Sequence, residues 1–265
     1  FAGPGALRIE SGADSFVGDF STSGWVFGND LSALTIGKPS NTANITMGST
    51  AAVAGPITVY GGDITINSAL TATASNINLH ALAEVTQTAA ITATGLGLHG
   101  AGNFTLTHTS NAVTTIAGGD ITTQLGNLAF VNATALEVGS VNPTGITSSG
   151  DIRIETLTGD LTVSEDIVST KAKSVSVVLV AGKDTAAGDA TGGDIIITND
   201  ATITVQADSQ ARLYTGSLAG SGGVAESATN EADGLIAFGS GRFRYNADEA
   251  TDFSTNGWTD LTSNG

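Results

Sequence analysis

Short runs of alternating apolar and polar residues return at a fixed distance within the stretch 57–109. The spacing in sequence number is 19 (96 − 77 = 19), and it separates Ile77 from Leu96, Leu79 from Leu98, His80 from His99, Ile66 from Val85, and Val85 from Phe104. Alternation brings every second side chain to the same side, as in a β-strand. Each run is too short to bury its apolar side alone, so we expect it to stack on the run one period away.

A period of roughly 20 residues that contains several short strands predicts a solenoid, in which each turn covers the apolar face of the next. The parallel β-helix fits best, because strand starts lie roughly 6 to 13 residues apart and give two to three strands per turn. A leucine-rich repeat would need a helix or a regular asparagine ladder in each turn, and a sandwich would not return the same side chain at a fixed spacing. We predict an all-β parallel β-helix (β-solenoid) of about 19–21 residues per turn, with roughly 13 turns and a length on the order of 60 Å.

The phrase Gly-Gly-Asp-Ile marks predicted corners between strands. It occupies 61–64, 118–121 and 192–195, with shorter forms at 150–152 and 159–161. Glycine permits a positive φ at a corner, and aspartate accepts hydrogen bonds from nearby backbone N–H groups as a strand begins. The aspartates of the first two phrases lie three periods apart (120 − 63 = 57), so we expect equivalent corners there.

A longer repeat follows in the second half of the chain. Ile152 matches Ile195 (195 − 152 = 43) and Leu161 matches Ile203 (203 − 161 = 42), which indicates two turns of about 21 residues. The last strands are predicted at 235–238 and 243–245.

The pattern divides the chain into three parts. Residues 1–33 are N-terminal rungs or a cap, because terminal repeats are usually atypical and this segment holds the aromatic residues Phe16, Phe20, Trp25 and Phe27. Residues 34–245 form the repeat body, with insertions near 181–193 and 206–234 that are either binding loops or tolerated surface loops. Residues 246–265 are polar around Phe253 and Trp258, and they are expected to be a linker or the start of a following module.

Composition favours a core of thin, stacked layers. Only 5% of the residues are aromatic and 35 are glycine, which suits small side chains. Lys and Arg total 9 against 25 Asp and Glu, and this net charge of −16 disfavours nucleic acid as a partner. There is no cysteine, so stability must come from packing and hydrogen bonding. No run reaches the ~18 apolar residues of a membrane span, and the start Phe1-Ala2-Gly3-Pro4 predicts an excised or processed piece.

Two stretches resemble the repeat region of filamentous-haemagglutinin-like proteins of Gram-negative bacteria. They are 34–64, with Leu34-Thr35-Ile36-Gly37-Lys38 and Gly55-Pro56-Ile57-Thr58-Val59-Tyr60-Gly61-Gly62-Asp63-Ile64, and Gly241-Arg242-Phe243-Arg244-Tyr245-Asn246, which is similar to the phrase that closes such a region. The resemblance implies a secreted, surface-held, right-handed β-helix that serves as a stalk or adhesive fibre. It also implies two-partner secretion, with an outer-membrane transporter as a partner of the parent protein. The family's secretion domain carries paired Asn-Pro signatures, whereas Asn142-Pro143 stands alone and is interpreted as a turn.

Candidate chemistry is sparse. No catalytic triad is indicated, because there is no cysteine and none of the three histidines lies near a Gly-x-Ser-x-Gly motif. His80 and His99 are expected to stack on successive turns, with His108 nearby; stacked surface histidines are favoured over a metal site because no carboxylate completes a ligand set. We expect no metal and no dedicated cofactor, and the Gly-Gly-Asp phrases lack the spacing of calcium-binding β-rolls.

Outward-facing polar residues raise two further alternatives. Asp151, Arg153 and Glu155 alternate with inward isoleucines, so all three point outward, as the active site of a polysaccharide lyase or hydrolase would require. The expected alignment, however, matches Arg153 with Ile196 two turns on, which favours a solvated charge cluster. Thr86-Gln87-Thr88 aligns with Thr105-Leu106-Thr107, a threonine ladder like those of ice-binding solenoids, limited to two turns.

These patterns lead to one functional expectation. We predict a non-enzymatic structural and adhesive segment of a secreted bacterial surface fibre, with a host, matrix or glycan ligand. A polysaccharide lyase or hydrolase and an ice-binding solenoid are the alternatives. Since each end of a β-helix leaves an unpaired strand edge, we also expect end-to-end self-association into filaments that strengthens when salt screens the charge of −16.

Overall fold

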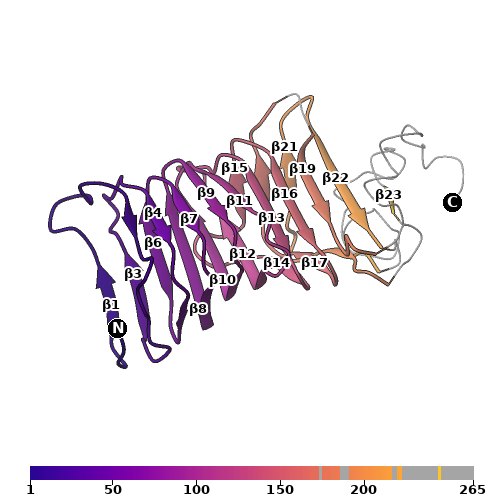
Figure 1. Ribbon diagram of the computed structural model, residues 1–265. Coiled ribbons are helices and arrows are strands. Elements are labelled where there is room, and N and C mark those ends of the chain that lie inside the picture. Colours follow the sequence, from indigo (N-terminus) through magenta and orange to yellow (C-terminus); the bar gives the residue numbers. More distant parts are fainter. Residues whose placement is uncertain (173–174, 186–190, 217–219, 223–243, 246–265) are drawn as a thin grey trace, which may run out of the picture.

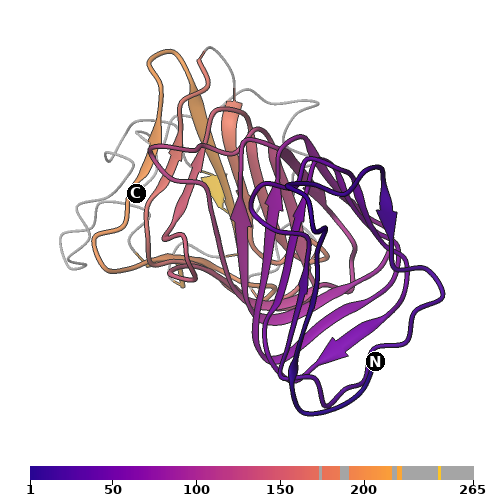
Figure 2. The same cartoon turned by 90° about the vertical axis from the view of Figure 1, so that its left-hand side faces the viewer.

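The computed structural model describes residues 1–172, 175–185, 191–216, 220–222 and 244–245. These residues form β-strands and connecting turns, without a helix. The strands stack in parallel from the N-terminal end to the C-terminal end of an elongated body (Figure 1). Figure 2 looks along this body from its N-terminal side and shows the chain winding around a common interior. The predicted all-β parallel β-solenoid is confirmed.

Two sheets run along the body. The first sheet has 13 strands, whose main path is β1 (Ala6–Ile9), β3 (Ala33–Ile36), β6 (Ile57–Gly61), β8 (Leu70–Ala81), β10 (Ile91–His99), β12 (Ala112–Gly118), β14 (Leu136–Val138), β17 (Leu161–Val163) and β20 (Ile195–Ile197). Beside this path lie β5 (Ala51–Val53), β15 (Ile146–Ser148), β18 (Ile167–Ser169) and β21 (Ile203–Val205).

The second sheet is a single stack of ten strands. They are β2 (Phe20–Ser21), β4 (Ile45–Met47), β7 (Ile64–Ile66), β9 (Glu84–Gln87), β11 (Asn103–Leu106), β13 (Leu128–Asn132), β16 (Ile152–Thr156), β19 (Val175–Val180), β22 (Gln210–Thr215) and β23 (Arg244–Tyr245). At about 4.8 Å per strand, this stack is on the order of 45 Å long.

The predicted spacing of 19 is confirmed where β8 meets β10 and where β9 meets β11. The pairs in register are Ile77 with Leu96, Leu79 with Leu98, His80 with His99, and Val85 with Phe104.

The predicted match of Ile66 with Val85 is wrong. Val85 lies opposite Ile64, at a spacing of 21 (85 − 64 = 21), and Ile66 lies opposite Gln87. The two extra residues are in β8, where the segment 72–76 faces the shorter segment 93–95 of β10. Within that bulge Ala74 has a φ of 55°. A local irregularity in one strand therefore shifts the register of the opposite sheet.

Later turns are longer than predicted. Leu128 pairs with Ile152, at a spacing of 24 (152 − 128 = 24), and Leu161 pairs with Ile195, at a spacing of 34 (195 − 161 = 34). The predicted match of Ile152 with Ile195 is wrong, since these residues lie in different sheets. The match of Leu161 with Ile203 is also wrong, because Ile203 pairs with Ile167. The second sheet of the described residues stacks ten strands, against about 13 turns expected for the whole chain, and the longer turns contribute to this difference.

The core consists of apolar columns along the body. One inward column of the first sheet is formed, in register, by Leu34, Ile57, Ile77, Leu96 and Ile116, all 0% exposed. Fully burying one such side chain contributes roughly 1.5–3 kcal/mol. Because each layer is one strand thick, every side chain in a column packs between its equivalents in the turns above and below.

Buried asparagines hold the corner at which the second sheet leads into the next turn. Asn132 Oδ1 accepts the N–H of Val113 at 2.9 Å, and its Nδ2 donates to the carbonyls of Val113, Thr134 and Ala135 at 3.0–3.1 Å. One turn earlier, Asn111 Oδ1 accepts the N–H of Ile91 at 2.9 Å. These amides satisfy backbone groups that the bend removes from the strand ladder.

The Gly-Gly-Asp-Ile corners are only partly equivalent. Asp63 directly precedes β7 and Asp194 directly precedes β20, as expected. At 118–121 the corner itself is confirmed, with a φ of 63° at Gly119, but no strand begins there, because Ile121 is 82% exposed and lies outside the strands. Asp120 Oδ1 accepts the N–H groups of Thr122 and Thr123 at 2.7 and 2.8 Å, which folds the chain back, and Leu125 enters the core instead.

The N-terminal aromatic residues form one cluster. The ring centroids of Phe16 and Phe20 lie 4.5 Å apart, those of Phe20 and Trp25 5.5 Å, and those of Phe1 and Trp25 5.1 Å. Phe16, Phe20 and Trp25 are partly buried against the core.

The domain boundaries stay predictions. The predicted strand 235–238, the segment 246–265, and residues 186–190, 217–219 and 223–234 of the two insertions lie outside the described residues.

Candidate functional site

The outward face of the second sheet changes character along the body. Strand register brings Ser21, Thr46, Thr65, Thr86 and Thr105 into one outward row, which we call the hydroxyl row. The same position continues as Ala129, Arg153, Val178 and Arg212 in the following strands. The row extends over five strands, whereas the sequence indicated a threonine ladder of two turns. A row of uncharged side chains thus runs along the sheet towards the strands in which Arg153 and Arg212 occupy the same outward position.

Glu155 is the central charged group of that region. Its side chain is 3% exposed and lies between two cations, with Oε1 paired with the Arg153 guanidinium and Oε2 2.8 Å from Lys183 Nζ. Arg153 and Lys183 are more open, with side chains 34% and 45% exposed. The carboxylate is therefore enclosed, while the cations face outward.

The predicted solvated charge cluster of Asp151, Arg153 and Glu155 is confirmed only in part, because Arg153 and Glu155 form an ion pair but the Glu155 side chain is 3% exposed. Asp151 turns to Lys171, with Oδ2 2.5 Å from Nζ. The expected match of Arg153 with Ile196 two turns on is also wrong, because Arg153 belongs to the second sheet and Ile196 pairs with Thr162 in the first. The alignment failed because apolar tripeptides of similar sequence occur in both sheets.

A pocket of about 250 Å³ opens beside Glu155, and we call it the β16 pocket. Its lining combines two hydroxyl groups, three apolar side chains and three charged side chains. These are Thr107 and Thr109, then Ala129, Phe130 and Val131, and finally Arg153, Glu155 and Lys183. The volume lies just below the ~300–1,000 Å³ of pockets for drug-sized ligands, so it suits a small ligand such as one sugar ring.

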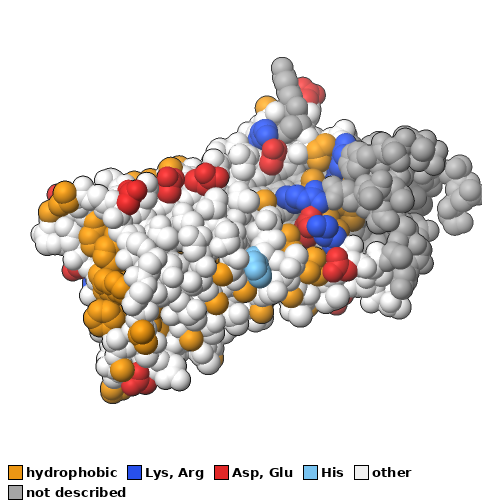
Figure 3. All heavy atoms as spheres, in the orientation of Figure 1, with side chains coloured by type: hydrophobic (Ala, Val, Ile, Leu, Met, Phe, Trp, Pro, Cys, Tyr) orange, Lys and Arg blue, Asp and Glu red, His pale blue; other side chains and the backbone are white. Residues whose placement is uncertain are grey.

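Positive charge is gathered in this part of the chain. Of the 9 Lys and Arg residues, only Arg8 and Lys38 precede residue 150. On the face shown in Figure 3, Lys and Arg side chains gather towards the C-terminal part of the described body, whereas acidic side chains follow one edge of the N-terminal part. Residues 151–265 thus hold seven of the nine Lys and Arg residues, together with 17 of the 25 Asp and Glu residues, so the β16 pocket lies where charges of both signs are concentrated.

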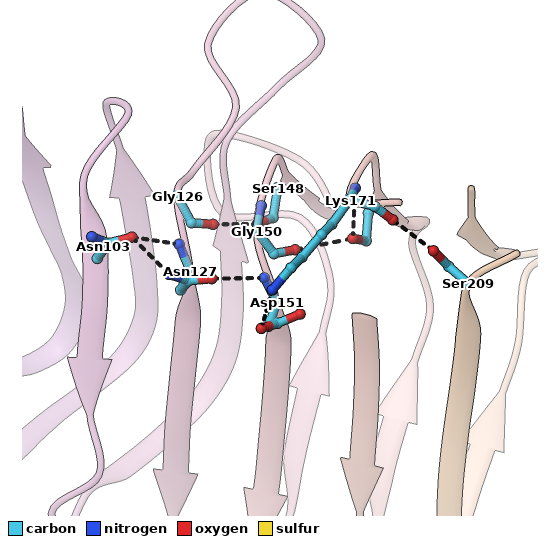
Figure 4. A network of polar contacts seen from close by, with 9 residues as sticks. Asn103, Gly126, Asn127, Ser148, Gly150, Asp151, Lys171 and Ser209 are labelled. Carbon is cyan, nitrogen blue, oxygen red and sulfur yellow. Dashed lines mark hydrogen bonds and ion pairs between the residues drawn. The ribbon is translucent and has the colours of Figure 1, made fainter. Parts of the chain in front are cut away.

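A polar ladder fixes the starts of the strands that carry the pocket (Figure 4). Asn103 Oδ1 accepts the N–H of Asn127 at 2.8 Å, and Asn127 Oδ1 accepts the N–H of Asp151 at 2.9 Å. The ladder ends in the ion pair of Asp151 with Lys171, whose carbonyl accepts Ser209 Oγ at 2.8 Å. Because Asp151 lies two residues before Arg153, this ladder positions the start of β16 and with it the pocket wall.

Two of the three histidines, His80 and His99, lie on the first sheet, in β8 and β10. The rings of His80 and His99 stack with centroids 4.0 Å apart and planes within 7°, and Tyr60 stacks on His80 at 4.3 Å. Burial, with a smaller contribution from the neighbouring His99, lowers the pKa of His80 to about 4, and burial also lowers the pKa of His99. His108 lies in a turn, where Nδ1 accepts the N–H of Ser110 at 3.2 Å. The described residues hold no group of three or more side chains suited to bind a metal ion.

Sequence reasoning missed Lys183, Thr107 and Thr109 as neighbours of Glu155. Lys183 lies in a stretch interpreted only as an insertion, and it reaches Glu155 because β19 pairs with β16 and places Val180 opposite Glu155. The usable signal was the rarity of cations in this chain, which makes each lysine next to a strand a candidate partner for an outward carboxylate.

The parallel stacking defines the chain as a β-solenoid protein. Searches with protein-family models, among curated proteins and among solved structures found no match. Among the described residues there is no helix of the length and apolarity that would cross a membrane.

Proposed function

We propose that this chain is a stiff, adhesive segment of a secreted fibre on the surface of a Gram-negative bacterium. The observation that carries the proposal is the stack of ten parallel strands in the second sheet, which makes the body long relative to its width. A solenoid of this kind holds a ligand-binding surface at a fixed distance along a fibre. The resemblance to filamentous-haemagglutinin-like repeats supports the secreted, surface-held location.

In this proposal the second sheet is the adhesive face. It is regular over the hydroxyl row and then opens into the β16 pocket, with two outward cations over a buried carboxylate. Strand register places the hydroxyl row, Arg153 and Glu155, so this part of the face keeps its spacing without a ligand.

Small-angle scattering and an adhesion assay test the proposal together. The purified chain is expected to scatter as a rod and to coat beads that then attach to host cells or extracellular matrix. A compact particle that leaves the beads unattached contradicts it.

A polysaccharide lyase or hydrolase is the second candidate, and the β16 pocket is what favours it. Glycoside hydrolysis generally uses two carboxylates on either side of the scissile bond, one of which receives or donates a proton. Here both oxygens of Glu155 are held in ion pairs, and Asp151 is paired with Lys171. Cleavage of acidic polysaccharides by the pure chain, lost in Glu155→Gln, would establish the enzyme in place of the adhesive segment.

The hydroxyl row favours ice binding as a third candidate, because its five side chains repeat at the ~4.8 Å strand spacing. Inhibition of ice recrystallisation by the chain, abolished by Thr86→Glu, would establish this function.

A further inference from the structure

We propose that the β16 pocket binds one terminal, carboxylate-bearing sugar of an otherwise neutral glycan. The inference rests on the proposed adhesive function and names its ligand. It combines three features of the second sheet: the charges of the pocket, its mixed lining, and the acidic residues beside the hydroxyl row.

The charges of the pocket select an anion. Among its lining residues, Arg153 and Lys183 carry two positive charges and Glu155 one negative charge, which leaves one net positive charge. The negative charge is also the least accessible, since the Glu155 side chain is 3% exposed against 45% for Lys183. Lys183 forms its ion pair with Glu155 through the ammonium group. An ammonium group has three N–H donors. A carboxylate that enters the pocket therefore meets the ammonium group before it meets Glu155.

The remaining lining suits a sugar ring. Thr107 and Thr109 are exposed and provide hydroxyl groups, which donate and accept hydrogen bonds with sugar hydroxyls. Ala129 and Val131 provide apolar surface for the C–H face of a ring. The volume of about 250 Å³ fits a ligand of this size.

Residues beside the hydroxyl row limit the charge to one end of the glycan. Asp63 and Glu84 stand two positions before Thr65 and Thr86, so each points to the same side of the sheet as its threonine. A polymer with a carboxylate on every sugar would bring its charges beside these acids. Neutral sugars that follow the charged one would instead meet the uncharged row. The sheet therefore selects a glycan with a single acidic terminus over a polyuronate.

Calorimetric titration of the full chain tests the inference with three defined probes. These are sialyllactose, which has one terminal carboxylate sugar, lactose, which has none, and tetragalacturonate, which has one on every sugar. We expect sialyllactose to bind, and to bind more weakly as salt rises. Lactose and tetragalacturonate are expected to bind at least about tenfold more weakly. Lactose lacks the carboxylate that contacts Lys183, and tetragalacturonate brings carboxylates beside Asp63 and Glu84.

Two variants with equal change of net charge identify the site. Lys183→Gln is expected to weaken sialyllactose binding about tenfold, the size of losing one charge-assisted contact. Lys38→Gln, outside the second sheet, is expected to leave it unchanged. Circular dichroism checks that both variants keep the β-sheet spectrum.

Several results would overturn the inference. These are absence of sialyllactose binding at millimolar concentration, equal weakening by both lysine variants, or tighter binding of tetragalacturonate or of a sulfated lactose. The adhesion assay separates this failure from failure of the proposed function. Beads that attach to matrix although the chain binds no sialyllactose overturn only the pocket assignment. Release of cleaved sugar, detected by mass spectrometry, overturns the adhesive function while leaving the site in place.

Discussion

The two halves of the second sheet share one core and differ on the outside. From β4 to β11 the spacing between paired residues is 19 to 21 (64 − 45 = 19, 85 − 64 = 21, 104 − 85 = 19), and the outward row carries only threonine. From β11 to β22 the spacing rises to between 24 and 35 (128 − 104 = 24, 210 − 175 = 35), and two of the four positions in the row are arginine.

The difference shows how a solenoid acquires a site. A short turn uses nearly all its residues in strands and corners, which leaves a regular face. Longer turns add loop residues at the corners, and these bring Lys171 and Lys183 against Asp151 and Glu155. Inward columns thus repeat in both halves, while β16 supplies Arg153 and Glu155 and the longer turns supply the lysines that pair with Asp151 and Glu155.

The largest expected effect tests whether the two halves share one core. Ile64 and Ile154 are both 0% exposed, at inward positions of the second sheet in the N-terminal and C-terminal half. Replacing either by Ala should destabilise the protein by about 2–5 kcal/mol, because a cavity remains between neighbouring layers. Urea unfolding measures both. A loss below ~1 kcal/mol for Ile154→Ala alone would show that the C-terminal half is packed differently.

The next effect concerns the polar groups at the corners. Asn132→Leu should cost about 2–4 kcal/mol, because the N–H of Val113 and three carbonyls lose their buried partner. Asn103→Ala, at an exposed corner, should cost below ~1 kcal/mol in the same unfolding measurement. Similar losses of stability for the two variants would contradict the distinction between the buried Asn132 and the exposed Asn103.

Acid should act on the N-terminal half, where the histidines stack. Burial lowers the pKa of His80 in the folded protein to about 4, whereas in the unfolded chain this pKa has its ordinary value of 6.5. As the pH falls below 6.5, the unfolded chain therefore binds the proton first. The contribution of neutral His80 to the free energy of unfolding is fully present above pH 6.5 and is lost between pH 6.5 and about pH 4. We expect a loss of roughly 1–2 kcal/mol, reduced from the full shift because the rings are partly exposed.

Thermal unfolding of the wild type and of a His80→Gln/His99→Gln variant measures this loss. The variant should lose less Tm between pH 7 and pH 4.5. Equal slopes in the two proteins would assign the acid sensitivity to the carboxylates.

The smallest effect is expected for the exposed ion pair of the C-terminal half. In that pair the side chains of Lys171 and Asp151 are 36% and 47% exposed. Asp151→Asn should change the free energy of unfolding by below ~1 kcal/mol, because solvent screens such pairs. The amide also keeps an oxygen near Lys171. A loss above ~2 kcal/mol in urea unfolding would mean that the polar ladder depends on this charge.

By itself, the sequence determined the fold class and the local register. Alternation shows which side chains point inward, and the short period requires neighbouring turns to stack, so the pairing of Ile77 with Leu96 and of His80 with His99 followed directly. These features depend on residues close in sequence. The candidate site was predictable only in that Arg153 and Glu155 lie on the same outward face.

Only the tertiary structure decided the pairing over long turns and the partners across them. A tripeptide such as Ile152-Arg153-Ile154 fits either sheet equally well, because its alternation carries no information on which sheet it joins. The bulge at Ala74, the turn that expels Ile121 and the loops of the later turns set that choice. Lys183 meets Glu155 because β19 stacks on β16, and a contact that depends on the summed length of a whole turn cannot be read from the residues at its two ends.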